Sequence, residues 1–364
     1  MMRAVCALQL ALQLSGVASD MLPPPPPPCT DKDFAAGQCM RLVTMTDKAK
    51  SDGAVCLDGS PGVFYWHPAT DPKHENDWIL SFKGDGWCYD AQDCLGRSKN
   101  GFGGSDFLSN VTTGWNGGIL SGNDKDFGGF NKVILENCDG ASLTGDMTEP
   151  LMVSNHAQPE EPAVPIFFRG RRIRDAIFAT LLDPQGPYGM HTAENVLLTG
   201  CSSGGLAAYL HSDWAHALMV RSAPSLKRFK TLGVSGFFLQ HDSVQGLPVY
   251  QTQMANVMQM QNTTGALNPA CLAARSEDKA WECMFAQNSY AVTKVPTFVE
   301  NSALDMWQMW CIYGAAPLSG FPNATSSMNG NCSESTIRCD KRFLFLSRFV
   351  LKTISFTKTG SGQT

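Results

Sequence analysis

The chain has 364 residues, 43% of them hydrophobic and 17% charged, which is enough apolar material for one large domain or two small ones. Its formal net charge of −5 argues against a nucleic-acid partner, because such partners normally require a basic face. The densest run of positive charge, at residues 169–174, is interpreted as the solvated start of a helix.

The N-terminus has the pattern of a secretory signal peptide over residues 1–19. A positive charge at Arg3 precedes an apolar run at 4–14, and this run is too short to span a bilayer. A proline-rich leader follows over 20–40, in which Pro23–Pro28 is a stiff, extended run without a fold of its own. We therefore expect the folded domain to occupy residues 41–341, in a protein without a stable membrane span.

Cysteines and glycosylation motifs also indicate that the protein is secreted. Of 13 cysteines, Cys6 lies in the signal peptide, and the even number that remains can pair in an oxidising compartment. Asn-x-Ser/Thr motifs begin at four candidate glycosylation sites: Asn110, Asn262, Asn323 and Asn331. We expect a secreted protein of the extracellular space or cell wall. Since the chain has no Cys-x-x-Cys pair and no histidine cluster, we expect no metal and no cofactor.

Short apolar runs and one amphipathic helix alternate along the chain. The runs are rich in aromatic and β-branched residues, as buried strands are, and they occupy 62–66, 78–82, 132–135, 195–199 and 295–299. Residues 171–182 have the apolar spacing of a helix, whereas 96–129 is rich in Gly, Asn and Ser and predicts loops. This alternation indicates a single α/β domain, with a mostly parallel central sheet and helices on both faces.

The segment Gly200-Cys-Ser-Ser-Gly204 lies between a predicted strand and a stretch of helical character. A strand, a tight glycine-flanked turn that carries a serine, and then a helix are the layout of a nucleophile elbow. The glycines suit a strained turn whose neighbours pack closely. The helix N-terminus behind Ser202 favours negative charge. The segment therefore predicts acyl transfer with Ser202 as the nucleophile.

Further candidates follow other predicted strands, at the edge of the sheet where Ser202 is expected. The oxyanion that forms on acyl transfer needs N–H donors, and we expect these from Ser203 and from the turn Gly84-Asp85-Gly86. The alternative for this turn is an ordinary loop. A carboxylate at Asp85 opposes an oxyanion, but if this side chain points to solvent, its backbone N–H can still donate. Asp305 is expected to orient a catalytic histidine, and its alternative role is a helix N-cap.

A histidine should follow Asp305 in this order of residues, yet the last histidine of the chain is His241. His211 and His216 are interpreted as surface or satisfied core residues. His241 follows an apolar segment, and it either lies in an ordinary loop or rims a pocket. Local sequence reasoning therefore leaves the general base unassigned.

The motifs, taken together and in order, resemble those of the pectin acetylesterases over about residues 41–310. They are Ala54-Val-Cys-Leu-Asp-Gly-Ser-Pro61, Gly84-Asp-Gly-Trp-Cys88, Asn137-Cys-Asp-Gly-Ala-Ser-Leu-Thr-Gly-Asp146, Phe168-Arg-Gly170, Gly200-Cys-Ser-Ser-Gly-Gly205 and Asn301-Ser-Ala-Leu-Asp-Met-Trp-Gln308. The related Notum-type carboxylesterases share the elbow. The resemblance implies an α/β-hydrolase-like fold, a Ser–Asp–His triad with Ser202 and Asp305, and removal of an ester-linked acyl group, typically acetate from pectin. Trp87, Phe237 and Phe238 are expected to bind the substrate.

The chain departs from the family pattern at several positions. The family usually has three glycines before Trp-Cys, whereas this chain has Asp85 in the middle, and it usually has alanine where Ser203 stands. The family segment before the paired phenylalanines usually carries an Asp, whereas this chain has Val234-Ser-Gly236 there. The family histidine lies near the C-terminus beside cysteines, and residues 342–364 do not match that setting. We interpret this stretch as an atypical tail, truncated or mis-spliced.

Three cysteine pairings are suggested. Cys88 with Cys94 would close a small loop beside the expected oxyanion turn, and Cys271 with Cys283 would crosslink a loop at the rim of the expected active site. Cys138 and Cys201 would bridge if their strands are neighbours and the geometry allows it; otherwise they are buried thiols.

The resulting expectation is a monomeric, secreted serine carbohydrate esterase that acts on acetylated, pectin-like polysaccharide. One alternative is a catalytically inactive relative that binds glycan, since the expected base is missing. The other is a Notum-type carboxylesterase that acts on lipid acyl groups. The abundance of Gly and Asn in 96–129 favours an open polar groove over the deep apolar pocket that a lipid would need.

Overall fold

The structure is a computed structural model that describes residues 30–112, 118–302 and 305–314. The expected signal peptide, the leader before residue 30, the tail at 342–364, and the sequons at Asn323 and Asn331 lie outside the described residues. The sequons at Asn110 and Asn262 lie at exposed positions. Within the described residues, no helix combines the length and the apolar character that crossing a membrane requires.

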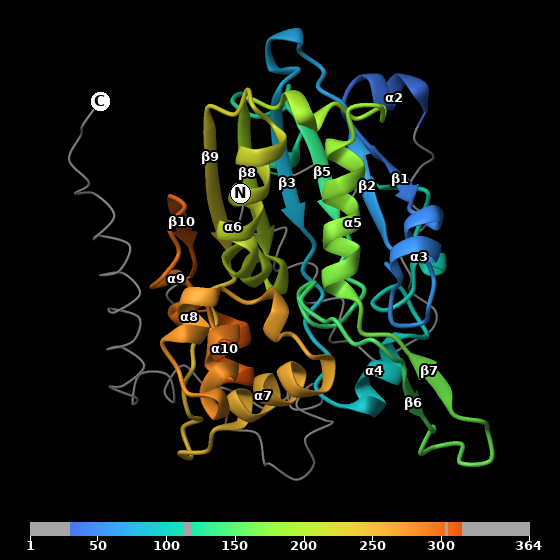
Figure 1. Cartoon of the computed structure of the whole chain (residues 1–364), viewed down its shortest axis with the longest axis vertical. Helices are drawn as coiled ribbons and strands as arrows, with labels where there is room; N and C mark the ends of the chain where they lie inside the picture. Colours follow the sequence, from blue (N-terminus) through green and yellow to red (C-terminus); the bar gives the residue numbers. More distant parts are fainter. Residues whose placement is uncertain (1–29, 113–117, 303–304, 315–364) are drawn as a thin grey trace.

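A mixed sheet of eight strands organises the described part of the chain (Figure 1). Five neighbouring strands run parallel, in the order β10 (Thr297–Glu300), β9 (Arg228–Val234), β8 (Asn195–Cys201), β3 (Asp77–Phe82) and β5 (Asn131–Leu135). Three antiparallel strands complete it: β2 (Val63–His67), β1 (Met40–Thr44) and β4 (Val111–Thr112). Every residue of β3 and β5 is buried, as expected of strands covered on both faces.

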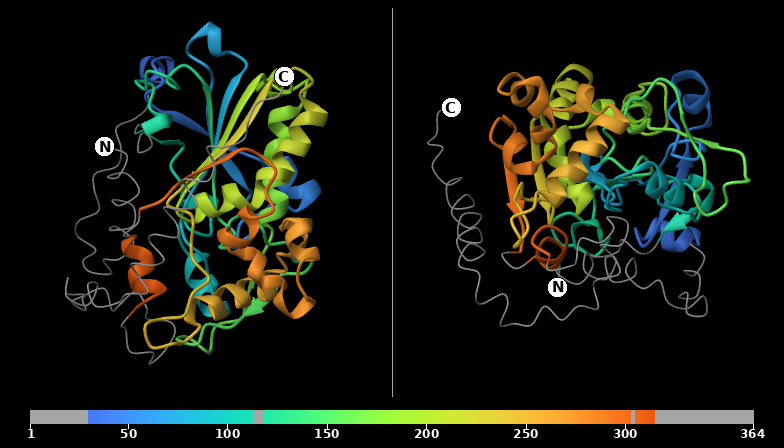
Figure 2. Two further views of the ribbon diagram at one scale, coloured as in Figure 1. Left: turned by 90° about the vertical axis from the view of Figure 1, so that its left-hand side faces the viewer. Right: turned by 90° about the horizontal axis from the view of Figure 1, so that it is seen from below.

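Alternate residues of the central strands enter two different cores, because successive side chains of a strand point to opposite faces. Trp78 and Leu80 of β3 pack in the core beneath helices α5 (Gly170–Leu182) and α6 (Ser203–Ser222). These two helices lie in front of the sheet in Figure 1 and on one side of it in Figure 2. Ile79 points to the other face, where Leu120 of the following loop region covers it.

The strand register brings the ends of all five parallel strands to one edge of the sheet. Phe82 of β3 pairs with both Gly200 of β8 and Leu135 of β5, and Val234 of β9 pairs with both Cys201 and Glu300. The segments that follow these strands therefore start side by side. They carry the turn at 84–86, the loop that begins at Glu136, the elbow at Ser202, and Asp305.

Short helices gather beyond this edge around a second apolar core (Figure 1). They are α4 (Ala91–Arg97), α7 (Val249–Gln261), α8 (Pro269–Ala273), α9 (Ala286–Tyr290) and α10 (Met306–Cys311), with the 3₁₀ segments η5 (Thr264–Ala266) and η6 (Glu277–Met284). A hairpin of β6 (Leu151–Val153) and β7 (Val164–Ile166) stands apart from the main sheet. The remaining elements are α2 (Asp31–Ala35), α3 (Thr46–Asp52), η1 (Pro72–His74), η2 (Ser105–Phe107), η3 (Gly118–Leu120) and η4 (Met190–Thr192).

Three disulfides join described residues. Cys88–Cys94 and Cys271–Cys283 are the two short-range pairs suggested from the sequence. The suggested pairing of Cys138 with Cys201 is wrong, because Cys138 is bonded to Cys56, 82 residues earlier in the chain. That bond ties the loop after β5 to the turn before β2, two segments whose proximity only the folded sheet establishes.

Candidate active site

Ser202 stands at a strained corner between β8 and α6. Its backbone φ of 59° lies in the left-handed region that residues with a side chain rarely adopt. Such strain persists only where the surroundings enforce it, and here the Ser202 N–H donates to the Val234 carbonyl at 3.0 Å. The residue is half-buried, and its hydroxyl has no hydrogen-bond partner among the described residues. The corner therefore presents a free hydroxyl at the start of a 20-residue helix.

Glycines make this corner possible by letting three backbone segments touch. A Cβ at Gly200 would overlap the Gly204 carbonyl oxygen, and a Cβ at Gly204 would overlap that of Phe82. A Cβ at Gly84 would overlap the carbonyl oxygen of Cys201. The turn after β3 therefore packs directly against the elbow, as an oxyanion turn must, and no larger residue fits at these three positions.

Ser203, the residue after the corner, is fully buried, and its side chain reaches the turn. Its Oγ accepts hydrogen bonds from the N–H groups of Asp85 and Gly86, both at 2.9 Å. These two amides were expected to face an oxyanion, and the structure corrects this because they point at Ser203 instead. Among the described residues, the backbone N–H groups of Gly84, Trp87 and Ser203 remain without a partner.

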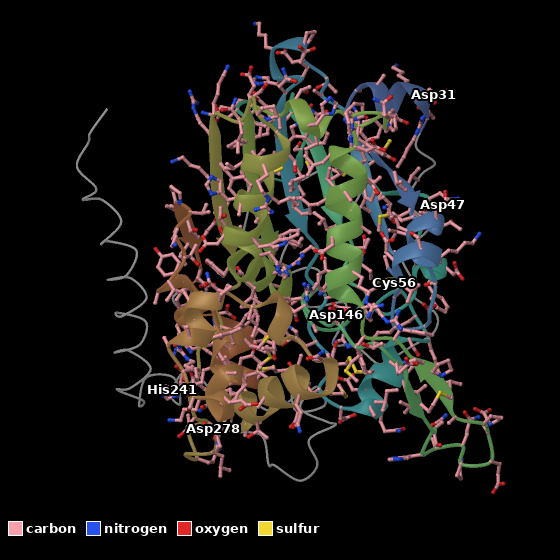
Figure 3. The ribbon with its side chains drawn as sticks, viewed as in Figure 1. Asp31, Asp47, Cys56, Asp146, His241 and Asp278 are labelled. Atoms are coloured by element: carbon pink, nitrogen blue, oxygen red, sulfur yellow. A yellow bond between two sulfur atoms is a disulfide. The ribbon has the colours of Figure 1, made fainter. Side chains whose placement is uncertain are left out.

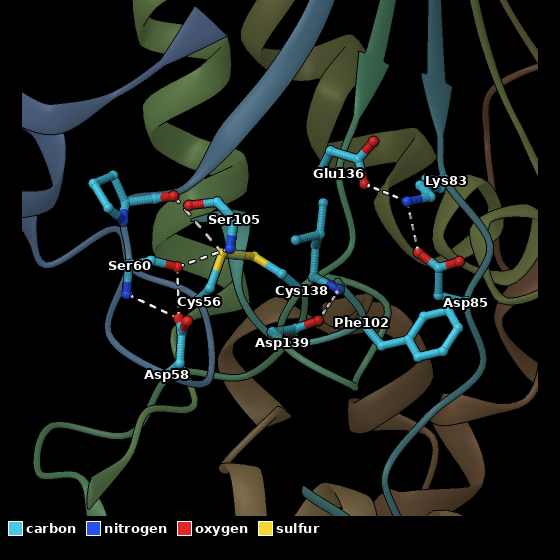
Figure 4. The surroundings of a disulfide bond; sticks show 12 residues. Cys56, Asp58, Ser60, Lys83, Asp85, Phe102, Ser105, Glu136, Cys138 and Asp139 are labelled. Atoms are coloured by element: carbon cyan, nitrogen blue, oxygen red, sulfur yellow. Dashed lines mark hydrogen bonds and ion pairs between the residues drawn. A yellow bond between two sulfur atoms is a disulfide. The ribbon is translucent and has the colours of Figure 1, made fainter. Parts of the chain in front are cut away.

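The condition that the Asp85 carboxylate points to solvent is not met, because Asp85 is only 4% exposed. Its carboxylate lies 3.4 Å from the Lys83 ammonium, which also donates to Glu136 at 2.8 Å (Figure 4). Burial raises the pKa of Asp85 to about 6, and Lys83 opposes that rise. The charge beside the turn is therefore held inward and partly neutralised by a buried lysine.

The loop that follows β5 is built around the carboxylate of Asp139, which is fully buried. Its oxygens accept the N–H groups of Ala141 and Leu143 at 3.0 Å and of Gly145 at 3.2 Å. The same loop also contacts the elbow, because the Ser142 hydroxyl donates to the Ser203 carbonyl oxygen at 2.9 Å. The motif that contains Asp139 therefore braces the start of α6.

All seven histidines lie within the described residues, and none contacts Ser202 or Asp305. His211 is fully buried between Arg174 and the Ser142 carbonyl, at 2.8 and 2.9 Å. Because arginine only donates, Nδ1 accepts and Nε2–H donates. Burial and the charge of Arg174 lower the pKa of His211 well below its usual value, so the ring is neutral and locked. Arg174 is itself buried. The interpretation of the positive run at 169–174 as the solvated start of a helix is therefore wrong for this residue.

His241 is half-buried in a loop, and its Nδ1 lies 2.6 Å from the Asp242 carbonyl oxygen. Its ring packs against Tyr313, with ring centroids 4.9 Å apart. Figure 3 shows His241 at the lower left margin of the molecule. The structure places His241 in a loop, and a position at the rim of a pocket stays a prediction.

Asp305 follows β10, which is two strands from β8 in the sheet, so it lies beyond the same edge as Ser202. It is the N-cap of α10, where it accepts the N–H of Gln308 at 3.1 Å. Its second oxygen accepts from the side-chain amides of Gln308 at 3.2 Å and Asn301 at 3.4 Å. The cap that was the alternative reading is present, and a role as triad acid stays a prediction.

Comparison with known proteins connects this geometry to a family. The sequence profile described as Pectinacetylesterase matches residues 35–359. The chain belongs to the pectinacetylesterase family. The match extends beyond residue 310, where the resemblance read from the motifs ended.

Similar members of the family come from plants and animals. Pectin acetylesterase 11 of Arabidopsis thaliana is 32% identical over 270 residues, covering 73% of this chain and 63% of that protein. Palmitoleoyl-protein carboxylesterase NOTUM of Schmidtea mediterranea is 25% identical, covering 70% and 47%. This pectinacetylesterase-family chain therefore spans about 63% of the length of the plant relative.

The fold is likewise that of a solved structure. The Wnt deacylase Notum from Drosophila superposes with a TM-score of 0.63 at 20% sequence identity, covering 82% of this chain and 81% of that one. The likeness establishes the fold, which is α/β-hydrolase-like with a mostly parallel central sheet. The fold class inferred from the sequence is therefore confirmed.

The aromatic residues expected to bind substrate in this pectinacetylesterase-family chain are core residues. Trp87, Phe237 and Phe238 are 1%, 6% and 2% exposed and pack in the second apolar core, and contact with a substrate stays a prediction. Sequence reasoning missed two half-buried aromatics that pack on Trp87: Tyr89, at a ring-centroid distance of 6.5 Å, and Trp307, at 5.8 Å. Trp307 lies two residues after Asp305, and that proximity in sequence was the available signal.

No group of three or more His, Cys, Asp and Glu side chains within the described residues is arranged to hold a metal ion.

Proposed function

We propose that the protein is a secreted carboxylic ester hydrolase that removes acetyl groups from a pectin-like polysaccharide, with Ser202 as the nucleophile. The observation that carries the proposal is the strained, half-buried Ser202 whose hydroxyl is free, set against unpaired backbone amides. Membership of the pectinacetylesterase family supports the reaction class. The three disulfides support an oxidising, extracellular destination.

The reaction would follow from the geometry of the corner. Ser202 Oγ attacks the ester carbonyl carbon, the alcohol of the sugar leaves, and the acyl group remains on Ser202 until water removes it. The negative oxygen that forms would accept from the N–H of Ser203, aided by the positive end of α6. Among the described residues, Gly84, which packs against this corner, carries another N–H without a partner, and so does Trp87 at the end of the same turn. Asp305 is proposed as the acid that orients the base.

The placement of the histidines favours a second candidate, a relative that binds acetylated glycan without hydrolysing it. The Ser202 proton needs an acceptor, and none of the seven histidines lies in contact with this hydroxyl. Loss of a base lowers the rate by several orders of magnitude, although oxyanion donors alone retain some catalysis. The rate of acylation is therefore the quantity that separates the two candidates.

The test is to incubate the full chain with a fluorophosphonate probe and with an aryl acetate. We expect the probe to label wild type and Ser222→Ala, a control at the far end of α6, but not Ser202→Ala. Labelling that survives in Ser202→Ala would exclude this serine. A chain that neither labels nor turns over the ester, but sediments with acetylated pectin, would support the glycan-binding candidate.

Substrate class needs a separate comparison. We expect acetate release from acetylated pectin to exceed release from acetylated xylan, and both to exceed hydrolysis of a long-chain aryl ester. Preference for the long-chain ester would instead support a lipid-directed activity, the kind named for the Notum relatives.

A further inference from the structure

Two residues that depart from the family pattern, Asp85 and Ser203, are in direct contact although 118 positions separate them. The Asp85 N–H donates to Ser203 Oγ at 2.9 Å, and the next amide, of Gly86, donates to the same oxygen at the same distance. In a chain with alanine at 203, neither amide would have this acceptor. The hydroxyl of Ser203 therefore has a specific task at the turn beside the proposed nucleophile.

The same turn is held at two further points. Arg97 Nη1 donates to the Asp85 carbonyl oxygen at 2.7 Å, and the Asp85 carboxylate is paired with the buried Lys83. The N–H, the C=O and the side chain of Asp85 are thus each bonded to a different partner. Gly86 follows with a φ of +73°, which sets the direction of the chain into Trp87. The peptide groups of this turn consequently have little freedom to rotate.

The position of the hydroxyl decides what it can do. Ser203 has no exposed surface, so its Oγ cannot reach a substrate and is not a second nucleophile. Its two lone pairs are both taken by the two amides, which leaves its own hydrogen to donate. The Asn137 side-chain amide lies 3.4 Å away, and Asn137 Oδ1 is buried without a partner. Asn137 can accept this hydrogen by turning its amide, which would complete the network.

We propose that Ser203 is a positioning residue that fixes the 84–86 turn, and that Asp85 and Ser203 act as one coupled unit. By accepting the Asp85 and Gly86 amides, Ser203 withdraws them from the substrate and fixes the turn, whose first residue, Gly84, packs against Ser202 and carries an N–H without a partner among the described residues. Oxyanion stabilisation then depends on a rigid turn with fewer available donors. The inference rests on the proposed function, because acylation of Ser202 is its rate readout.

The first experiment measures the turn without using activity. Amide hydrogen exchange is followed at residues 84–88 in wild type, Ser203→Ala and Ser212→Ala. Ser212 is a matched control: it is a fully buried serine of the same helix, with one hydroxyl bond to Thr231 at 2.7 Å, away from the turn. We expect the Asp85 and Gly86 amides to exchange at least about 10-fold faster in Ser203→Ala and at the wild-type rate in Ser212→Ala. Unchanged exchange in Ser203→Ala would overturn the proposal even if the protein proves not to be an esterase.

The second experiment measures the rate of fluorophosphonate labelling at Ser202. We expect Ser203→Ala to label at least about 10-fold more slowly than wild type, and Ser212→Ala to label like wild type, although both variants lose one buried hydroxyl bond. The double variant Asp85→Gly/Ser203→Ala should recover at least about 3-fold relative to Ser203→Ala, because a flexible turn can redirect its freed amides toward the oxyanion. Faster labelling in Ser203→Ala, or additive losses in the double variant, would overturn the coupling. Absence of labelling in wild type, with the exchange result as expected, would defeat the proposed function alone.

Discussion

The corner at Ser202 and the corner at Asp305 follow two strands of the same sheet, but they are held in place by different means. At Ser202 the backbone of three segments is in contact, and glycines at 84, 200 and 204 are the residues that allow it. At Asp305 the chain is held by side-chain hydrogen bonds to Gln308 and Asn301. Backbone packing tolerates almost no substitution, whereas a capping bond has several chemical solutions. The two corners should therefore respond very differently to mutation.

The largest effect is expected from the long-range disulfide beside the Ser202 corner. Removing Cys56–Cys138, by changing both residues to Ala, should lower the free energy of unfolding by about 4–5 kcal/mol, because the bond closes a loop with a sequence separation of 82. Removing Cys88–Cys94, with a separation of 6, should cost about 2 kcal/mol. Urea unfolding without reductant measures both. Equal losses would show that local packing, and not chain entropy, sets the contribution of these bonds.

The second prediction concerns the glycines of the elbow. Gly204→Ala should destabilise the fold by about 3 kcal/mol or more, since the new Cβ would overlap backbone atoms of Phe82. Gly96→Ala is the control, because a Cβ there meets nothing within 4 Å and the position lies inside α4. This control should be neutral or more stable by about 0.5–1 kcal/mol. Thermal unfolding checks both variants, and a tolerated Gly204→Ala would contradict the close approach of the segments.

The third prediction uses the buried carboxylate of the turn. The pKa of Asp85 is about 6 in the folded state against 3.8 for the ordinary value, so the folded protein holds the extra proton between these values. A raised acid pKa means stability that is present below about pH 4 and lost as pH rises to about 6. Relative to Asp85→Asn, the free energy of unfolding of wild type should fall by roughly 2–3 kcal/mol between pH 4 and pH 7, at about 1.4 kcal/mol per unit of pKa difference. Parallel stability curves for the two proteins would contradict the burial of this charge.

The smallest effect is expected at the other corner. Asp305→Ala should cost about 1 kcal/mol through loss of the N-cap of α10, whereas Asp305→Asn should be close to neutral, because Asn caps helices as well as Asp does. The two variants separate the cap from the charge. A loss of esterase rate in Asp305→Asn at unchanged stability would assign the carboxylate a role in the reaction. A loss larger than about 3 kcal/mol for Asp305→Ala would show that more than a cap holds this corner.

Sequence patterns placed most of the elements that build the site. The expected strands at 78–82 and 132–135 correspond to β3 and β5, and the expected helix at 171–182 corresponds to α5. Strand β9 was missed, because Arg228–Val234 mixes exposed charged residues with buried ones and lacks a continuous apolar run. The burial of Trp87 and Phe238 was also missed. Whether an aromatic residue near a site faces substrate or core depends on neighbours that are distant in sequence.

The amino-acid sequence alone determined the elbow, the order of strand and helix around it, and the family, because these rest on rules that act within a few residues: side-chain period, the steric need for glycine, and short motifs. Only the tertiary structure decided that Ser203 accepts the amides of Asp85 and Gly86, that Asp85 turns inward to Lys83, and that Cys138 is bonded to Cys56. The physical reason is strand register. Phe82 pairs with Gly200 and with Leu135, and that alignment alone sets which segments meet at the end of the sheet.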